Sequence, residues 1–144
     1  MSMKMWREYT FPQLKRIVDA GHELGCPVIL HSCGYQVCFL DDYVKLGIDM
    51  LQSFQPHAGN DFREAFAKYG DKLTFVTGID IQRGEKMTPE ELKAEIIENY
   101  KIGRATGRHM LGTTHELQYT MPMQNLRTIF QTVNEIQAGK YDSQ

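Results

Sequence analysis

Four short apolar runs alternate with longer amphipathic segments, and this alternation limits the possible folds more than any other feature of the chain. The runs are residues 27–30, 48–54, 73–77 and 108–111. Apolar residues at helical spacing fill the segments before, between and after them. Strands that alternate with helices through short connections are typical of a parallel sheet. We therefore predict an α/β fold, with residues 1–144 forming a single domain.

The predicted helices are bounded by recognisable start and stop signals. We expect helices at residues 11–24, 37–46, 61–69, from Thr88 onward, and at 123–138. Thr88 and the Pro-Glu-Glu that follows it combine a capping residue, a first-turn proline and acidic side chains near the helix dipole. Gly47 and Gly70 are expected to end their helices as left-handed caps. Residues 139–144 are expected to form a frayed tail.

Composition excludes several classes of function. The chain has 42% hydrophobic and 24% charged residues and a net charge of −2, without the basic stripe that nucleic-acid binding requires. No apolar run approaches the ~20 residues that a membrane helix needs, and no secretory signal begins the chain. Three cysteines do not make a disulfide framework. We expect a cytoplasmic protein with no nucleic-acid or membrane partner.

Unusual polar residues follow each predicted strand, whereas the strand starts carry ordinary turn residues. Parallel α/β folds place their functional groups at the C-terminal ends of the strands. We therefore expect one functional face, formed by four segments: His31-Ser32-Cys33-Gly34, Gln55-Pro56-His57, Gly78-Ile79-Asp80 and Thr113-Thr114-His115-Glu116.

His31 and Cys33 are the first candidates for metal binding. They are two residues apart at a strand end, so their side chains emerge on the same side of the sheet. Imidazole nitrogen and thiolate sulfur are ligands that zinc prefers. The alternative is a polar turn with a free thiol and no metal. Cys38 is interpreted as a core residue, and Cys26, His22 and His109 as structural residues away from the functional face.

Five blocks in order resemble the C-terminal half of the uroporphyrinogen decarboxylase superfamily. The blocks are HSCG, LGIDMLQSFQP, YGDKLTFVTGIDIQ, TPEELKAEI and LGTTHELQYTMPMQNL. The superfamily includes the decarboxylase of haem biosynthesis and corrinoid-dependent, zinc-containing methyltransferases, and the chain resembles the methyltransferase branch more closely. The resemblance implies a TIM barrel, of which the four strands would be the last four.

A barrel of this type needs ~250 residues, and the chain has 144. The resemblance therefore implies a half-barrel: a gene fragment, an engineered half or one subunit of a split enzyme. Half a barrel leaves two open edge strands, which must be covered. We expect a homo-oligomer, or a partner chain that supplies the N-terminal half.

The resemblance also implies roles for individual residues. In the methyltransferase branch, HSCG matches a His-x-Cys zinc motif whose third ligand is a distant cysteine, and here His115 stands in that region. In the decarboxylase branch a histidine of the same region acts in the active site. Asp80 is expected either to orient a ligand or hold substrate, or only to cap a helix. Gln55 and His57 are candidate contacts for substrate or cofactor, with an exposed, inactive His57 as the alternative.

Three functions remain open at this point. The first is zinc-dependent methyl transfer from a methylated corrinoid to a thiol, with His31, Cys33 and His115 as zinc ligands. The second is cofactor-free decarboxylation of a tetrapyrrole, with His115 as the proton donor. The third is a half-barrel without catalytic activity that binds a corrinoid, a corrinoid protein or a partner chain.

Overall fold

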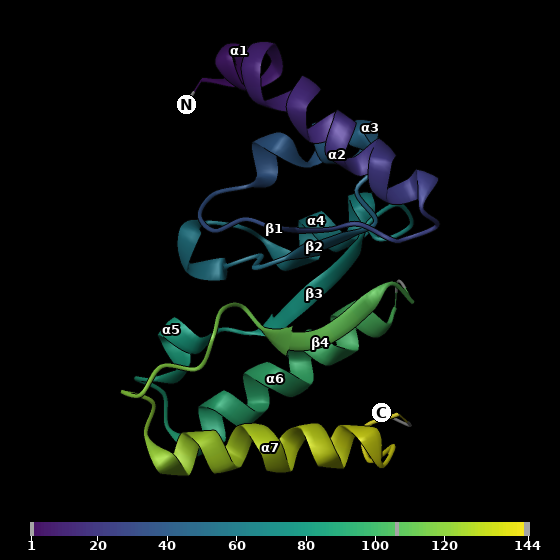
Figure 1. Ribbon diagram of the computed structural model, residues 1–144. Helices are drawn as coiled ribbons and strands as arrows, with labels where there is room; N and C mark the ends of the chain where they lie inside the picture. Colours follow the sequence, from purple (N-terminus) through teal and green to yellow (C-terminus); the bar gives the residue numbers. More distant parts are fainter. Residues whose placement is uncertain (1, 106, 143–144) are drawn as a thin grey trace.

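The computed structural model describes residues 2–105 and 107–142. Four parallel strands form one sheet in the order β1-β2-β3-β4, with helices between consecutive strands (Figure 1). This confirms the predicted α/β class. The strands are β1 Ile29–His31, β2 Met50–Gln52, β3 Thr74–Ile79 and β4 His109–Thr113.

The helical segments follow the predicted order. The N-terminal helical arm consists of α1 (Met3–Met5), a π-helical turn (Trp6–Thr10) and α2 (Phe11–Glu23). The remaining helices are α3 Leu40–Leu46, α4 Phe62–Tyr69, α5 Ile81–Gly84, α6 Pro89–Arg104 and α7 Met123–Gln137, with 3₁₀ turns at Val37–Phe39 and Pro56–Ala58. Thr88 caps α6, as predicted, and the structure shows a complete capping box with Glu91. None of the described helices is both long enough and apolar enough to cross a membrane.

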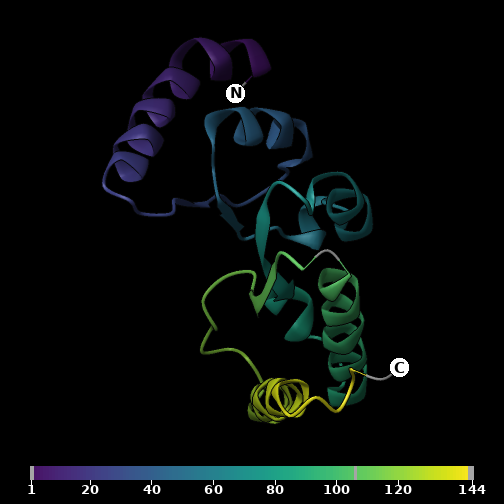
Figure 2. The same ribbon diagram turned by 90° about the vertical axis from the view of Figure 1, so that its right-hand side faces the viewer.

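Side chains alternate between the two faces of the sheet, and only one face is covered by helices. The row Leu30, Leu51, Phe75 and His109 runs across all four strands. Phe66 of α4 packs against Phe75 and His109 with ring centroids 4.7 and 5.3 Å apart. Helices α3, α4 and α6 lie on this side, while the described residues place no helix over the other face of β2 and β3 (Figures 1 and 2).

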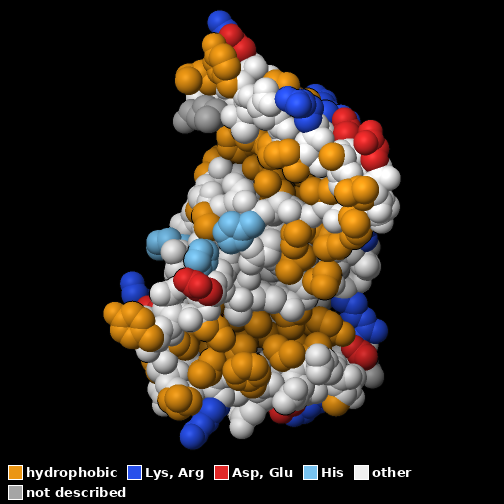
Figure 3. Space-filling view, in the orientation of Figure 1, with side chains coloured by type: hydrophobic (Ala, Val, Ile, Leu, Met, Phe, Trp, Pro, Cys, Tyr) orange, Lys and Arg blue, Asp and Glu red, His pale blue; other side chains and the backbone are white. Residues whose placement is uncertain are grey.

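The uncovered face carries apolar side chains. Ile29, Met50 and Thr74 form one row of this face, and Val76 and Met110 belong to the next. Ile29 and Met110, on the two edge strands, are each 53% exposed. Hydrophobic side chains accordingly spread over much of the face shown in Figure 3. In a closed barrel the corresponding inward-facing positions are buried.

Two details of the sequence-based expectations are wrong. Cys38 is exposed rather than in the core, because the 3₁₀ turn at Val37–Phe39 directs Val37 and Phe39 inward instead. Gly70 keeps a right-handed conformation (φ −64°) and continues into a turn, whereas Gly47 is left-handed as predicted.

The C-terminal residues that the structure describes make specific contacts. The amide N–H of Lys140 donates to the carbonyl of Glu135, and its ammonium group lies 2.8 Å from Glu135 Oε1. The hydroxyl of Tyr100, on α6, donates to Asp142 Oδ1 at 2.7 Å. Residues 139–142 therefore turn back against α6 and α7. The rest of the expected frayed tail, residues 143–144, lies outside the described residues.

His109 packs so closely against α6 that residue 103 must be glycine. A Cβ at Gly103 would lie 2.0 Å from His109 Nδ1. The ring cannot move away easily, because Nε2 donates to the carbonyl of Thr77 at 2.9 Å. Burial lowers the pKa of His109, so the neutral ring is the form that occupies this position.

We predict that Gly103→Ala lowers the free energy of unfolding by about 1–3 kcal/mol through overpacking, although alanine favours a helix by roughly 1 kcal/mol over glycine. In a His109→Ala background the clash is gone, so the same substitution should stabilise the protein. Urea denaturation of the four variants measures both effects. A Gly103→Ala effect of the same sign in both backgrounds would contradict this packing.

Candidate metal centre

His31 and Cys33 meet at the C-terminal end of β1. His31 is the last residue of the strand, and Cys33 follows two residues later. His31 Nε2 lies 3.3 Å from Cys33 Sγ. Both residues are exposed, so the pair is open to an incoming ion or substrate.

His115 joins this pair from the other edge of the sheet. It follows β4 by two residues, after Thr114, which is fully buried. The N–H of Thr114 donates to the carbonyl of Ile79 at 2.9 Å and continues the strand pairing past β4. The rings of His115 and His31 meet edge to face, with centroids 5.7 Å apart. One ligand atom from each of His31, Cys33 and His115 lies within 4.8 Å of the other two.

Figure 3 shows histidine side chains gathered at one side of the molecule, beyond the ends toward which the strand arrows of Figure 1 point. His31 ends β1 and His115 follows β4 by two residues, so these candidates lie at the C-terminal ends of the strands, as expected. In a tetrahedral zinc site, neighbouring nitrogen and sulfur ligands are roughly 3.5 Å apart. The Nε2–Sγ separation of 3.3 Å fits this value, and two imidazoles with one thiolate fit the preferences of zinc.

Two neighbouring residues of β2 and its loop contact the candidate ligands. Gln52 Oε1 hydrogen-bonds His31 Nδ1, and Gln52 Nε2 donates to the carbonyl of Thr113 at 3.2 Å. Ser53 Oγ lies 3.4 Å from Cys33 Sγ. Ser53 is fully buried and has a φ of 78°. Among the described residues, 2–105 and 107–142, it is the one non-glycine residue with a positive φ.

The loop that carries Cys33 is held by buried amide side chains. Gln36 Nε2 donates to the carbonyls of Ser32 and, at 2.9 Å, of Ser53. Asn60 Oδ1 accepts from Gln36 N at 2.8 Å, while Asn60 Nδ2 donates to the carbonyls of Gly34 and Gln55. These bonds tie the loop after β1 to the loop after β2. The position of Cys33 thus depends on polar groups outside the candidate ligand set.

Gln55, His57 and Asp80 lie after the expected strands but outside the three-residue cluster. Gln55 is buried, and its Oε1 accepts from Gly34 N at 2.9 Å. His57 is exposed on the 3₁₀ turn after β2. Asp80 caps α5, with Oδ1 accepting from the amides of residues 82 and 83, and its Oδ2 is buried with no hydrogen-bond partner among the described residues. Of the two roles expected for Asp80, the cap is the one seen in these contacts.

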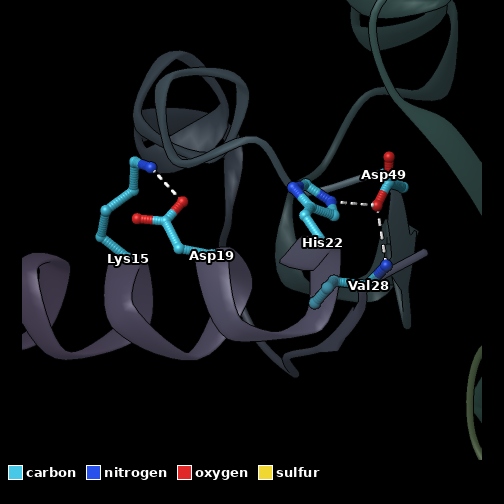
Figure 4. A network of polar contacts seen from close by, with 5 residues as sticks. All are labelled: Lys15, Asp19, His22, Val28 and Asp49. Carbon is cyan, nitrogen blue, oxygen red and sulfur yellow. Dashed lines mark hydrogen bonds and ion pairs between the residues drawn. The ribbon is translucent and has the colours of Figure 1, made fainter. Parts of the chain in front are cut away.

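The residues expected to be structural lie elsewhere. His22, near the end of α2, contacts Asp49 Oδ2 at 2.8 Å, and the same oxygen accepts from Val28 N at 2.7 Å (Figure 4). The Val28 amide, and then His22, hold the pKa of Asp49 below its usual value. This network lies where β1 and β2 begin, at the end of the sheet opposite His31. Cys26, also near the strand start, is exposed.

A separate hollow of about 310 Å³ lies between α4 and α6. Arg63, Arg83, Glu95 and Glu98 contribute to its walls. Arg63 pairs with Glu98, and Arg83 pairs with Glu95 at 2.9 Å. Burial raises the pKa of Glu95, and the nearby Arg83 opposes that rise. The charges of this hollow are thus compensated within the protein, and none of the three metal candidates lines it.

Comparison with known proteins gives the family. Residues 1–136 match the family model described as uroporphyrinogen decarboxylase (URO-D). The chain belongs to the URO-D family. The strand order and helix placement are consistent with part of the TIM barrel of this family.

One relative lies in the methyltransferase branch of the family. A methylated-thiol–coenzyme M methyltransferase of Methanosarcina mazei is 24% identical over 142 residues. The match covers 99% of this chain and 36% of the relative. The chain therefore spans about a third of the length of that enzyme.

His31 and Cys33 are predicted from their spacing at a strand end and His115 from the family resemblance, whereas the sequence predicts no role for the residues that contact them. Gln52 and Ser53 fall within the apolar run predicted as a strand at residues 48–54, and no role is predicted for Gln36 or Asn60. One signal was available for Gln52. It is a polar residue two positions after Met50 in the predicted strand, and therefore shares the uncovered face with its neighbours.

Proposed function

We propose that this chain binds zinc through His31, Cys33 and His115 and takes part in methyl transfer from a methylated corrinoid to a thiol or similar acceptor. The observation that carries the proposal is the approach of three ligand atoms to within 4.8 Å of one another, from β1 and β4 at opposite edges of the sheet. The methyltransferase relative supports the reaction class. Because the chain spans only part of that relative, the whole reaction stays a proposal.

Each proposed ligand is suited to its role by its surroundings. His31 uses Nδ1 in the hydrogen bond to Gln52, which leaves Nε2 toward Cys33 and the metal position. Three protein ligands leave a fourth position for a substrate. Bound there, zinc would act as a Lewis acid that lowers the pKa of an acceptor thiol, so that thiolate is available at neutral pH.

The remaining candidates have narrower proposed roles. His57 is exposed on the loop after β2 and is free to contact a donor or acceptor. Gln55 lies on the same loop as His57 and accepts a hydrogen bond from the amide of Gly34, one residue after Cys33. Asp80 holds the start of α5 and has one buried carboxylate oxygen left for a further partner. We propose substrate or cofactor contact for Gln55 and His57, and catalytic roles for Asp80 and His115.

We predict that the wild-type chain, purified anaerobically with added Zn²⁺, retains about one zinc per chain through these three ligands. His31→Ala, Cys33→Ala and His115→Ala should each lose most of it, and metal-dependent methyl transfer from methylcobalamin to a thiol should fall to background. Cys38→Ala is the matched control, because Cys38 is an exposed thiol outside the cluster. Elemental analysis after gel filtration measures the metal. A wild-type chain that retains no more zinc than Cys33→Ala would refute the proposal.

We further propose that the uncovered face of the sheet is covered in the working protein, by a second copy of the chain or by a chain that supplies the other half of a barrel. Ile29 and Met110 are half exposed on the two edge strands, whose outer hydrogen-bonding sides have no partner strand among the described residues. Exposed apolar edges of this kind favour association. A corrinoid protein would then meet the assembled face rather than the half alone.

Sedimentation velocity tests whether a second copy of the chain covers this face. We expect the 16.6 kDa chain to sediment as a dimer or larger species at micromolar concentrations. Met110→Lys should shift it toward monomer by charging the uncovered face. Phe130→Lys on α7 is the control, since Phe130 is similarly exposed (59%) but lies on a helix. A wild-type chain that is monomeric at every concentration would exclude self-association.

A further inference from the structure

Gln52 and Ser53 are adjacent in sequence, and each contacts a different proposed zinc ligand. We infer that these two residues position the metal site: Gln52 selects which nitrogen of His31 faces the metal, and Ser53 donates a hydrogen bond to the sulfur of Cys33. The inference rests on the proposed function, because it concerns the same three ligands. It assigns positioning roles to two residues that do not themselves bind the ion.

The amide of Gln52 can adopt only one orientation. Its Nε2 faces the carbonyl of Thr113 at 3.2 Å, and a carbonyl oxygen only accepts hydrogen bonds. The other end of the amide, Oε1, is therefore directed at His31 Nδ1. An amide oxygen also only accepts, so Nδ1 must carry the proton. In the neutral ring this leaves the lone pair on Nε2, the nitrogen 3.3 Å from Cys33 Sγ.

The same amide links the two segments that carry the histidines. His31 ends β1, and Thr113 ends β4 two residues before His115. Gln52, at the end of β2, bridges them across the uncovered face of the sheet. Loss of this side chain would free both the ring orientation of His31 and the end of β4. Partners of this kind typically change metal affinity 10- to 100-fold.

Ser53 keeps its hydroxyl at Cys33 despite an unfavourable backbone conformation. Its φ of 78° lies in the region that glycine adopts without strain and other residues avoid. Gln36 fixes this conformation by donating to the Ser53 carbonyl at 2.9 Å. Oγ then lies 3.4 Å from Sγ. Because a metal-bound thiolate has no proton, the hydroxyl must be the donor in the loaded site. Strain retained beside a candidate site is a reason to assign a function to the residue.

The test compares metal affinity and ligand spectra of purified variants of the chain. Zn²⁺ affinity is measured by competition with a chromophoric chelator, and Co²⁺ is used as the spectroscopic probe. Gln52→Leu should weaken zinc binding 10- to 100-fold. Gln52→Glu keeps an oxygen for His31 Nδ1 but loses the donor to the Thr113 carbonyl, so it should recover only part of the affinity. Gln131→Leu on α7 is the control for a lost exposed amide.

Ser53 is tested with two variants that separate the hydroxyl from the backbone. Ser53→Ala and Ser53→Gly both remove the donor, but only glycine relieves the strain at φ 78°. Both should weaken zinc binding several-fold and move the sulfur-to-cobalt charge-transfer band to longer wavelength, because a thiolate without its hydrogen bond is easier to oxidise. Ser32→Ala is the control. Ser32 lies between His31 and Cys33 in sequence, but its side chain hydrogen-bonds Tyr43.

The outcomes distinguish this inference from the proposed function. If the wild-type chain binds zinc, and Gln52→Leu and Ser53→Ala match it in affinity and in the cobalt spectrum, the positioning roles are overturned while the zinc site stands. If Ser53→Gly keeps the wild-type band, the hydroxyl has no role even when Gln52 does. If the wild-type chain binds no zinc, both proposals fail. Circular dichroism of each variant shows that it is folded, and Gln52→Glu and Ser53→Gly provide the test should Gln52→Leu or Ser53→Ala not fold.

Discussion

The parallel register of the four strands is the constraint on which the rest of the structure depends. Because all four strands run in one direction, their C-terminal ends lie at the same end of the sheet. Residues 82 positions apart in sequence, Cys33 and His115, are thereby brought within 4.8 Å, together with His31. The helices cover one face only, and rows of apolar side chains stay open on the other.

Hydrogen bonds between the loops position the candidate ligands more closely than the strand register alone. Gln36, Asn60 and Gln55 fix the loop around Cys33 against the loop after β2, and Gln52 links β1 to the end of β4. Most of these amides are buried, where a lost partner costs about 1–3 kcal/mol. Their contacts therefore hold the rings of His31 and His115 and the thiol of Cys33 in a defined arrangement.

The fold class and the end of the sheet that carries the candidate site are accessible from the sequence for physical reasons, whereas His115 as the third zinc ligand follows from the family resemblance. Apolar runs between amphipathic helices specify a parallel sheet. Polar residues that follow such runs must lie together at the C-terminal end of the strands. The surroundings of the ligands were less accessible. Nothing in Leu51-Gln52-Ser53-Phe54 indicates that Ser53 has a positive φ, because only the bonds from Gln36 reveal what stabilises it. Cys38 was misplaced because one 3₁₀ turn before α3 changes which side chains face inward.

The central claim is that two histidines and one cysteine from opposite edges of this sheet hold one zinc ion. Zinc K-edge X-ray absorption of the metal-loaded chain tests it most directly, since nitrogen and sulfur ligands differ in distance, roughly 2.0 against 2.3 Å. The account predicts one sulfur and two imidazole nitrogens in the first shell, with the sulfur lost in Cys33→Ser and one imidazole lost in His115→Ala. A shell without sulfur, or one unchanged in either variant, would contradict it.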